Sequence, residues 1–176
     1  MSAGRNTEAR NRHDTAARAR YLEAMIESHH QIDPEAWARL AQRFHAAIPH
    51  SLAIGLTLVD AGPPSVHMRL PYRDVFLGDI DAGLWHTGIA AVAADATCGL
   101  AVFLTLSARS AIATLDLRMD HLRPAVAGSA LDVVADCHHV TQRMAFVTAV
   151  LHQDDPTRPV ARATATFART GRLAPT

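Results

Sequence analysis

One acidic residue stands alone in the longest apolar stretch of the sequence. Asp95 is the only charged residue between Ile89 and Leu106, and its neighbours are small or aliphatic. Taking an unpaired carboxylate out of water costs several kcal/mol, so a core helix rarely carries one without a use. Such a group can act as a general base or as a nucleophile. We predict that Asp95 is catalytic; the structural alternative is a carboxylate that hydrogen-bonds to a neighbouring loop.

The segment that leads into this stretch has the features of an oxyanion site. Gly83 permits a tight turn, and Gly88 permits close approach of a ligand to the start of the helix. Backbone N–H groups at a helix N-terminus are free and carry partial positive charge, so they can stabilise an oxyanion. We predict that the Gly88 amide polarises a carbonyl group of the substrate.

The spacing of these two groups decides how they cooperate. Gly88 and Asp95 are seven residues apart, which is about 10 Å along a helix. Both groups must lie about 3 Å from the reacting atoms, and one helix cannot easily supply both. Two antiparallel copies of the helix, side by side in a symmetric dimer, can place Gly88 of one chain opposite Asp95 of the other. We therefore predict an obligate homodimer with its active sites at the interface.

The N-terminal part of the chain predicts a helical extension. Residues 1–20 contain five arginines and almost no large apolar side chain, so a flexible Arg-rich tail is expected. Helices packed on the domain are expected over residues 21–49, the second of them starting at Asp33 and Pro34. An apolar stripe runs along that second helix, and Pro49 is expected to end it. The stripe consists of Trp37, Leu40, Phe44 and Ile48.

From residue 50 onward the pattern is typical of strands interrupted by one buried helix. Two strands and a polar loop (Pro71–Ala82) precede the apolar stretch, and four strands follow it. The expected strands are Leu52–Val59, Val66–Leu70, Ala111–Leu122, Ser129–Val140, Met144–His152 and Val160–Ala168. This order predicts an α+β domain over residues 50–170, with an antiparallel sheet of about six strands around one central helix.

Composition argues against several other classes. Seventeen arginines balance 17 acidic residues, so no overall charge attracts nucleic acid or an anionic membrane. The apolar stretch is long enough to span a membrane, but Asp95 and many small residues favour a core helix. Neither Cys98 and Cys137 nor the pairs His29-His30 and His138-His139 have metal-site spacing. We expect no metal, no cofactor, and a cytoplasmic location.

The chain resembles the hotdog-fold acyl-CoA thioesterases, specifically the PaaI-type (phenylacetate-pathway-like) group. Residues 83–88 (Gly-Leu-Trp-His-Thr-Gly) are similar to the G-x-x-H-G-G loop of that family, and Asp95 follows His86 by nine residues. Residues 113–125 end in the family's L-R-P-A pattern, and residues 141–147 fit its next-to-last strand. The resemblance covers residues 50–170 and leaves the first 50 outside.

This resemblance implies a hydrolase. In the family the acid at the Asp95 position attacks the thioester carbonyl or activates water against it, and the amide at Gly88 forms the oxyanion hole. Thr114 matches a Ser or Thr that lies near the acid, on the strand of the second chain. The implied partners are an acyl-CoA substrate and a second copy of the chain, with dimers pairing further into a tetramer; the acyl group is not identified.

The loop departs from the family at two positions, and two arginines are candidate phosphate ligands. Thr87 replaces the middle glycine of the family motif, and Ile80 stands where an Asn often orients water or the carbonyl. We expect His86 to support the turn and, with Thr87, to contact the substrate. Arg123 and Arg143 are candidates for the phosphates of coenzyme A; strand-end salt bridges are the alternative for both.

Two other functions stay open. In a hotdog hydratase or dehydratase a histidine acts with an acid across the dimer, and His86 with Asp95 can mimic that pair. In a non-catalytic acyl-CoA-binding regulator the fold senses the ligand, and the Arg-rich residues 1–20 would contact DNA.

Overall fold

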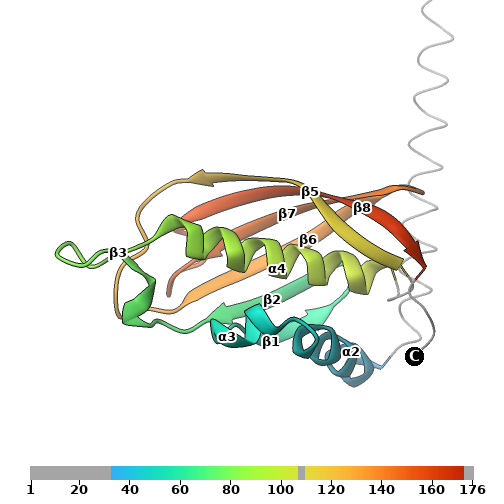
Figure 1. Cartoon of the computed structure of the whole chain (residues 1–176), viewed down its shortest axis with the longest axis horizontal. Helices are drawn as coiled ribbons and strands as arrows, with labels where there is room; N and C mark the ends of the chain where they lie inside the picture. Colours follow the sequence, from blue (N-terminus) through green and yellow to red (C-terminus); the bar gives the residue numbers. More distant parts are fainter. Residues whose placement is uncertain (1–32, 107–109, 173–176) are drawn as a thin grey trace, which may run out of the picture. The chain divides into compact units, whose positions relative to one another are not determined.

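A computed structural model of the chain describes residues 33–106 and 110–172 (Figure 1). The Arg-rich tail expected over residues 1–20 and the first helix expected after it lie outside these ranges. The chain divides into two units, residues 1–33 and 34–176, and the second contains the sheet. Its helices are α2 (Pro34–Ala46), α3 (Pro49–Ala53) and α4 (Thr87–Thr105), with a 3-10 turn η1 (Asp74–Phe76). Its strands are β1 (Thr57–Gly62), β2 (Ser65–Leu70), β3 (Leu77–Asp79), β4 (Leu84–Trp85), β5 (Ser110–His121), β6 (Leu131–Val140), β7 (Met144–His152) and β8 (Ala161–Arg172).

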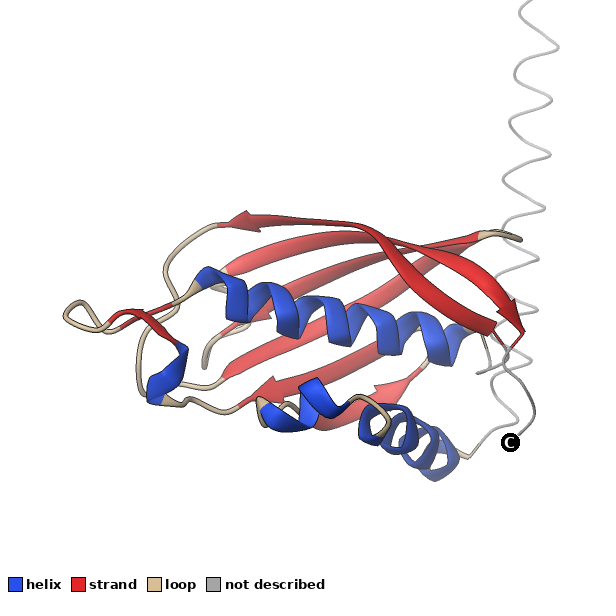
Figure 2. Ribbon diagram, viewed as in Figure 1, coloured by secondary structure: helices blue, strands red, loops and turns tan. Residues whose placement is uncertain are grey.

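Six strands form one antiparallel sheet in the order β1-β2-β6-β7-β8-β5, and α4 lies across one face of it (Figure 2). In β2 and β7 buried side chains that face α4 alternate with outward-facing ones, as the pleat requires. In β2 the buried positions are Val66, Met68 and Leu70. This arrangement confirms the expected α+β class and the six-stranded antiparallel sheet around a central helix. The pair β3–β4 forms a separate small hairpin.

Helix α4 is the core of the domain. It is long and apolar enough to cross a membrane, but most of it is buried within the chain. Its buried side includes Leu100 and Leu104, which are almost completely covered, and many alanines that let the sheet approach closely. A helix that is apolar around most of its circumference is either buried in a protein core or spans a membrane, and the burial of α4 within the chain favours the core position. The buried-helix interpretation of residues 89–106 agrees with this packing.

The helix α2 packs against β1 and α4. Trp37 and Ala41 are buried on its inner face, and the ring of Phe44 lies 4.2 Å from that of Phe103 in α4, measured between centroids. The apolar stripe predicted for this helix therefore faces the domain. Its start immediately after Asp33 agrees with the predicted boundary.

The prediction of a strand over Leu52–Val59 was wrong in its first half. Residues 49–53 form the short helix α3, because Pro49 has the φ angle of a first helical residue and begins a new turn instead of ending the segment. The chain then turns at Gly55, whose φ of +77° lies in the left-handed region that glycine adopts without strain. The strand β1 begins only at Thr57.

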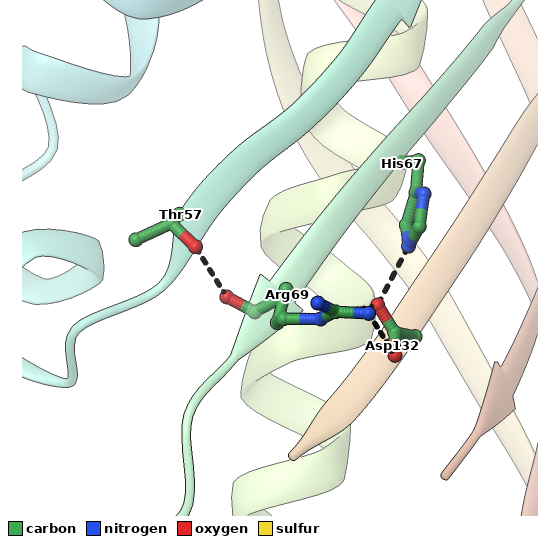
Figure 3. Close-up of polar contacts among 4 residues, drawn as sticks. All are labelled: Thr57, His67, Arg69 and Asp132. Atoms are coloured by element: carbon green, nitrogen blue, oxygen red, sulfur yellow. Dashed lines mark hydrogen bonds and ion pairs between the residues drawn. The ribbon is translucent and has the colours of Figure 1, made fainter. Parts of the chain in front are cut away.

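A polar network crosses the face of the sheet that points away from α4 (Figure 3). Asp132 in β6 is only 4% exposed, and its carboxylate accepts hydrogen bonds from His67 Nε2 at 2.7 Å and from Arg69 Nε and Nη2 at 2.9 and 3.0 Å. Thr57 donates to the backbone carbonyl of Arg69 at 3.0 Å. Three strands, β1, β2 and β6, are thus tied together on this face.

This network predicts an acid-sensitive contribution to stability. Burial alone would raise the pKa of Asp132, but the hydrogen bonds and charges of Arg69 and His67 outweigh burial and hold it below its usual value. The stabilisation by the ionised Asp132 is therefore complete above the pKa of the carboxyl in the unfolded chain, about 4. It is lost as the pH falls through the lower pKa of Asp132 in the folded protein. Asp132→Asn should lower the free energy of unfolding by about 1–3 kcal/mol at pH 7, and by less below pH ~4.

Urea unfolding of wild type and Asp132→Asn across this pH range measures the effect. The matched control is Asp136→Asn, which lies on the same strand and holds neither Arg69 nor His67. A difference between wild type and Asp132→Asn that stays constant from pH 7 to pH 3 would contradict the stated role of the carboxylate.

Candidate active site

Asp95 lies in the first half of α4, on the side that faces β5. The side chain is partly exposed, and the Thr114 hydroxyl donates a hydrogen bond to its Oδ1 at 2.9 Å. The resemblance placed Thr114 on the strand of the second chain; in the structure Thr114 of the same chain contacts the acid. The correction has a simple cause, since β5 directly follows α4 and returns along it. Among the described residues, no hydrogen bond reaches Asp95 Oδ2.

Both members of this pair lie near the free edge of the sheet. The strand β5 is the last in the strand order and pairs only with β8. Between Thr114 and Asp116 the pairing is interrupted by a bulge, at which Leu115 is 59% exposed. A bulge bends a strand and redirects its side chains. The carboxylate of Asp95 is therefore bonded to the edge strand of the sheet, next to this bulge.

At the N-terminus of α4 the predicted loop residues come together around His86. His86 is the N-cap residue, and its Nδ1 accepts the N–H of Gly88 at 3.0 Å. A Cβ on Gly88 would lie 2.9 Å from that nitrogen, so glycine is needed for this close approach. The Gly88 amide, predicted as the oxyanion donor, thus already has an acceptor within the chain. In the described part of the chain the Thr87 N–H makes no hydrogen bond.

The hairpin β3–β4 holds His86 in place. Leu77 pairs with Trp85, and the N–H of His86 donates to Phe76 O at 2.8 Å. Gly83 forms the turn with a φ of +63°, in agreement with the prediction for this residue. The polar loop expected over Pro71–Ala82 therefore contains regular structure that supports the helix start.

Gly78 is a further support of the site, and it predicts a sensitive position. A Cβ at Gly78 would lie 2.9 Å from the Cα of His86 and 3.2 Å from its backbone N. Since backbone atoms cannot move aside as a side chain can, Gly78→Ala should push β3 away from His86. We expect Gly78→Ala to lower the free energy of unfolding by about 1–3 kcal/mol. The displaced helix start should also lower kcat for the thioester hydrolysis that the resemblance implies, about tenfold or more.

The control for this substitution is Gly62→Ala, because a Cβ at Gly62 meets no atom within 4 Å and Gly62 has an ordinary φ. Thermal unfolding and steady-state kinetics of both variants separate two effects: the clash of the new Cβ with His86, and the general cost of replacing a glycine. Equal behaviour of the two variants would show that the contact between Gly78 and His86 does not matter.

The structure does not bring the acid and the helix start together within one chain. Thr87 and Asp95 lie on the same helix, eight residues or about 12 Å apart along its axis. The two arginines are also separated: Arg123 contacts the start of β8, and Arg143 contacts its other end at Arg169. Nine residues of extended strand, about 30 Å, lie between these contacts, so the two arginines of one chain cannot hold one phosphate.

The side chain of Arg123 is bonded to a backbone carbonyl, whereas the hydrogen bonds of Arg143 within the described residues involve only its backbone. Arg123 donates from Nε and Nη2 to the carbonyl of Arg158 at 3.1 and 2.7 Å, and its Nη1 is left for another acceptor. It lies at the same end of the sheet as the start of α4, because the loop that follows it is bonded to β4: Trp85 N–H donates to Ala125 O at 3.0 Å. Neither arginine forms a salt bridge in the described part of the chain.

Ile80 stands where the family often has an asparagine before the loop. Ile80 is 80% exposed at the tip of the β3–β4 turn. The neighbouring Asp79 uses its carboxylate to accept the N–H of Ala82 at 2.9 Å, which stabilises the turn. With isoleucine at position 80, the polar groups described at the candidate site are Asp95 with Thr114, and His86 with the amides that begin α4.

Two further kinds of reactive group, cysteines and metal-binding side chains, do not add to the candidate site. Burial raises the pKa of the Cys98 thiol to about 12, so it is not a nucleophile near neutral pH. Over residues 33–106 and 110–172 no group of three or more His, Cys, Asp or Glu side chains is arranged to hold a metal. The pair His138-His139 lies on β6, and His29-His30 is outside the described residues.

Sequence reasoning missed three residues that support the site: Gly78, Trp85 and Gln153. Trp85 donates from Nε1 to the carbonyl of Val126, and Gln153 bonds to the same peptide group. Trp85 stands inside the loop of residues 83–88, and the other two signals are a glycine in a polar loop and a glutamine at the end of an apolar strand. Such signals are common in turns, so only the three-dimensional contacts identify these roles.

Comparisons with known proteins agree with the fold, and the family match includes the loop before α4. The model of the thioesterase superfamily matches residues 82–160. A Pseudomonas aeruginosa protein of known structure is 33% identical, with a TM-score of 0.67 over 74% of this chain and 96% of that one. The phenylacetic acid degradation protein PaaI from Thermus thermophilus, solved as a mutant, is 26% identical, with a TM-score of 0.61 over 69% and 99% of the two chains.

A third structure supports the fold alone. The E. coli PaaI protein from the phenylacetic acid degradation operon is 17% identical, with a TM-score of 0.71 over 80% of this chain and 97% of that one. Among curated proteins no match was found. The long central helix, the six-stranded sheet and the family match over the loop and α4 all agree. The chain therefore belongs to the thioesterase superfamily and is a PaaI-type hotdog protein.

Proposed function

We propose that this protein is an acyl-CoA thioesterase that hydrolyses its substrate to a free acid and coenzyme A. One observation carries the proposal. In a chain of the thioesterase superfamily, the only charged residue of the central helix accepts a hydroxyl hydrogen bond on one oxygen, and its other oxygen has no hydrogen bond among the described residues. A carboxylate held in this way can accept a proton from water without losing its orientation.

In the proposed reaction Asp95 acts as the general base. Its free oxygen takes a proton from a water molecule, and the water oxygen forms a bond to the thioester carbonyl carbon. The C–S bond then breaks, and the departing sulfur takes up a proton as coenzyme A. Direct attack by the carboxylate, the alternative for the same residue, would use the same oxygen. The reaction needs only water besides the thioester, so no resident cofactor is invoked.

The carbonyl oxygen becomes negative during this attack and needs hydrogen-bond donors. The first turn of α4 supplies them, with the partial positive charge of a helix N-terminus. Gly88 can donate only when the ring of His86 turns away, because His86 Nδ1 now accepts its N–H. The Thr87 N–H can donate without such a movement, so we assign the principal donor role to Thr87. The Gly88 N–H instead orients the ring of His86 through the hydrogen bond to Nδ1.

A second copy of the chain completes the proposed site. The 12-residue strand β5 is an unpaired edge, and a long free edge is an efficient template for pairing. Antiparallel pairing of two β5 strands about a two-fold axis would extend the sheet and set the α4 helices side by side in opposite directions. The Asp95 carboxylate of one chain then approaches the first turn of α4 in the other. The pairing of dimers into tetramers stays a prediction.

The substrate is proposed as an acyl-CoA, with Arg123 available to its phosphates from the end of the sheet where α4 begins. The hydratase or dehydratase alternative is less well supported, because the Nδ1 of His86 is already occupied by the N–H of Gly88 at the start of α4. For the regulator, the chain segment expected to contact DNA lies outside the described residues.

Release of free thiol from a panel of acyl-CoAs tests the proposal. The panel pairs phenylacetyl-CoA, chosen because two structural relatives carry phenylacetic acid degradation names, with straight-chain acyl-CoAs of increasing length. We expect turnover of at least one ester, at a rate well above spontaneous hydrolysis. Absence of hydrolysis across the panel by a folded dimer would refute the thioesterase function.

A further inference from the structure

The side chain of Gln153 is a buried amide with all its hydrogen-bonding groups in use. It follows β7 directly and is 4% exposed. Its Oε1 accepts the N–H of Val126 at 2.9 Å, and its Nε2 donates to Val126 O at 2.9 Å and to Ser129 O at 3.0 Å. One donor and two acceptors fix which way the amide points. Breaking a buried network of this kind leaves several polar groups without partners.

The peptide of Val126 connects Gln153 to the tryptophan that precedes the helix start. Val126 O accepts a second hydrogen bond, from Trp85 Nε1, at 2.9 Å. Trp85 is buried, and its backbone N–H donates to Ala125 O at 3.0 Å. The loop and β4 are also joined by the bond from Ala127 N–H to Gly83 O at 2.7 Å. The loop over residues 124–128 is therefore held by Gln153 on one side and holds β4 on the other.

This connection ends at the proposed oxyanion donors. His86 follows Trp85 directly, its N–H donates to Phe76 O, and its ring caps α4 through Gly88. The position of Trp85 thus fixes where the cap begins and where the Thr87 N–H points. Hydrogen-bond donors must lie within a few tenths of an ångström of their best position to stabilise a transition state.

We propose that Gln153 is a positioning residue for the reaction: through Val126 and Trp85 it sets the orientation of the first turn of α4. It touches neither the acid nor the proposed donors, so its effect is indirect. The inference rests on the proposed function and adds Gln153 to it. This residue lies at the turn between β7 and β8 and contacts the loop over residues 124–128. A purely structural glutamine would lower stability without changing the chemistry.

The test compares Gln153→Met and Gln153→Glu with wild type. Methionine keeps the length of the side chain but has no amide. Glutamate replaces the amide nitrogen, and with it both N–H donors, by one oxygen that faces two carbonyl groups. The control is Ser129→Ala, which removes a hydrogen bond to Asp154 at 2.9 Å between the same two loops without touching Val126 or Trp85. Kinetics with the best acyl-CoA of the panel are measured well below the unfolding temperature of each variant. Amide hydrogen exchange is followed at Trp85, His86 and Ala127.

We expect both Gln153 variants to lower kcat about tenfold or more and to change KM less, because the donors act mainly on the charge that develops in the transition state. The Trp85, His86 and Ala127 amides should exchange faster, and Ser129→Ala should match wild type in both measurements. A lower unfolding temperature with kcat within about twofold of wild type would overturn the proposal, as would unchanged exchange at these amides. If wild type hydrolyses no acyl-CoA, the thioesterase function fails, and the exchange data alone decide whether Gln153 holds the turn.

Discussion

Replacing Asp95 by asparagine is expected to lower kcat for acyl-CoA hydrolysis by about 10²- to 10⁴-fold, the range that a general base contributes. The asparagine has the same shape, and its side-chain oxygen can still accept the Thr114 hydroxyl, so the fold should be kept. What disappears is the ability to take a proton from water. The substrate should still bind, because the carboxylate is not needed to hold it, and KM should therefore change little.

The measurement is steady-state thiol release at equal protein and dimer concentration. Asp136→Asn is the control, since it removes a carboxylate from β6 on the sheet and leaves α4 untouched. Unfolding curves of the three proteins show whether the comparison is made on folded material. Activity of Asp95→Asn within about tenfold of wild type would rule out the general-base role and also direct attack by the carboxylate.

The second large effect is expected from Thr87→Pro. Proline has no N–H, so it removes the proposed oxyanion donor and nothing else from the backbone. The position tolerates it: Thr87 is the first residue of α4, where proline is common. The preceding His86 has φ −68° and ψ 126°, the extended conformation that a residue before proline adopts. We expect kcat to fall by about 10²- to 10³-fold, as for the loss of one oxyanion donor.

Two further variants separate the backbone from the side chain at this position. Thr87→Gly keeps the N–H and restores the middle glycine of the family motif, so its kcat should stay close to wild type. Thr87→Ala serves the same purpose without adding backbone freedom. Full activity of Thr87→Pro would assign the donor role to the Gly88 amide, released from His86, and would remove Thr87 from the mechanism.

The sequence predicted the parts of the fold that depend on local patterns. The apolar stretch with one carboxylate became α4, and the alternating stretches after it became β5 to β8 with small shifts at their ends. The prediction for residues 49–56 was wrong for two reasons. Proline can both end one helix and begin the next, and the short apolar stretch that begins at Leu52 does not distinguish a helix from a strand.

The residues of the candidate site could be proposed from the sequence, but their contacts could not. Spacing identified Asp95 and the loop before α4, and the structure places Thr114 on the acid and His86 on the helix start. Which chain supplies Thr114 depends on the path of β5 along α4, and which amide is free depends on the rotamer of His86. Gln153 and Gly78 act through backbone atoms of distant segments, and a single sequence carries no signal for such contacts.

The central claim is that each active site combines Asp95 of one chain with the helix start of the other. Co-expression of Asp95→Asn and Thr87→Pro chains carrying different affinity tags, followed by purification on both tags, gives the mixed dimer. Each homodimer should be almost inactive, whereas the mixed dimer has one intact site of two and should show about half of the wild-type activity. A mixed dimer as inactive as the two homodimers would contradict the account, because it would show that the acid and the donor act within one chain.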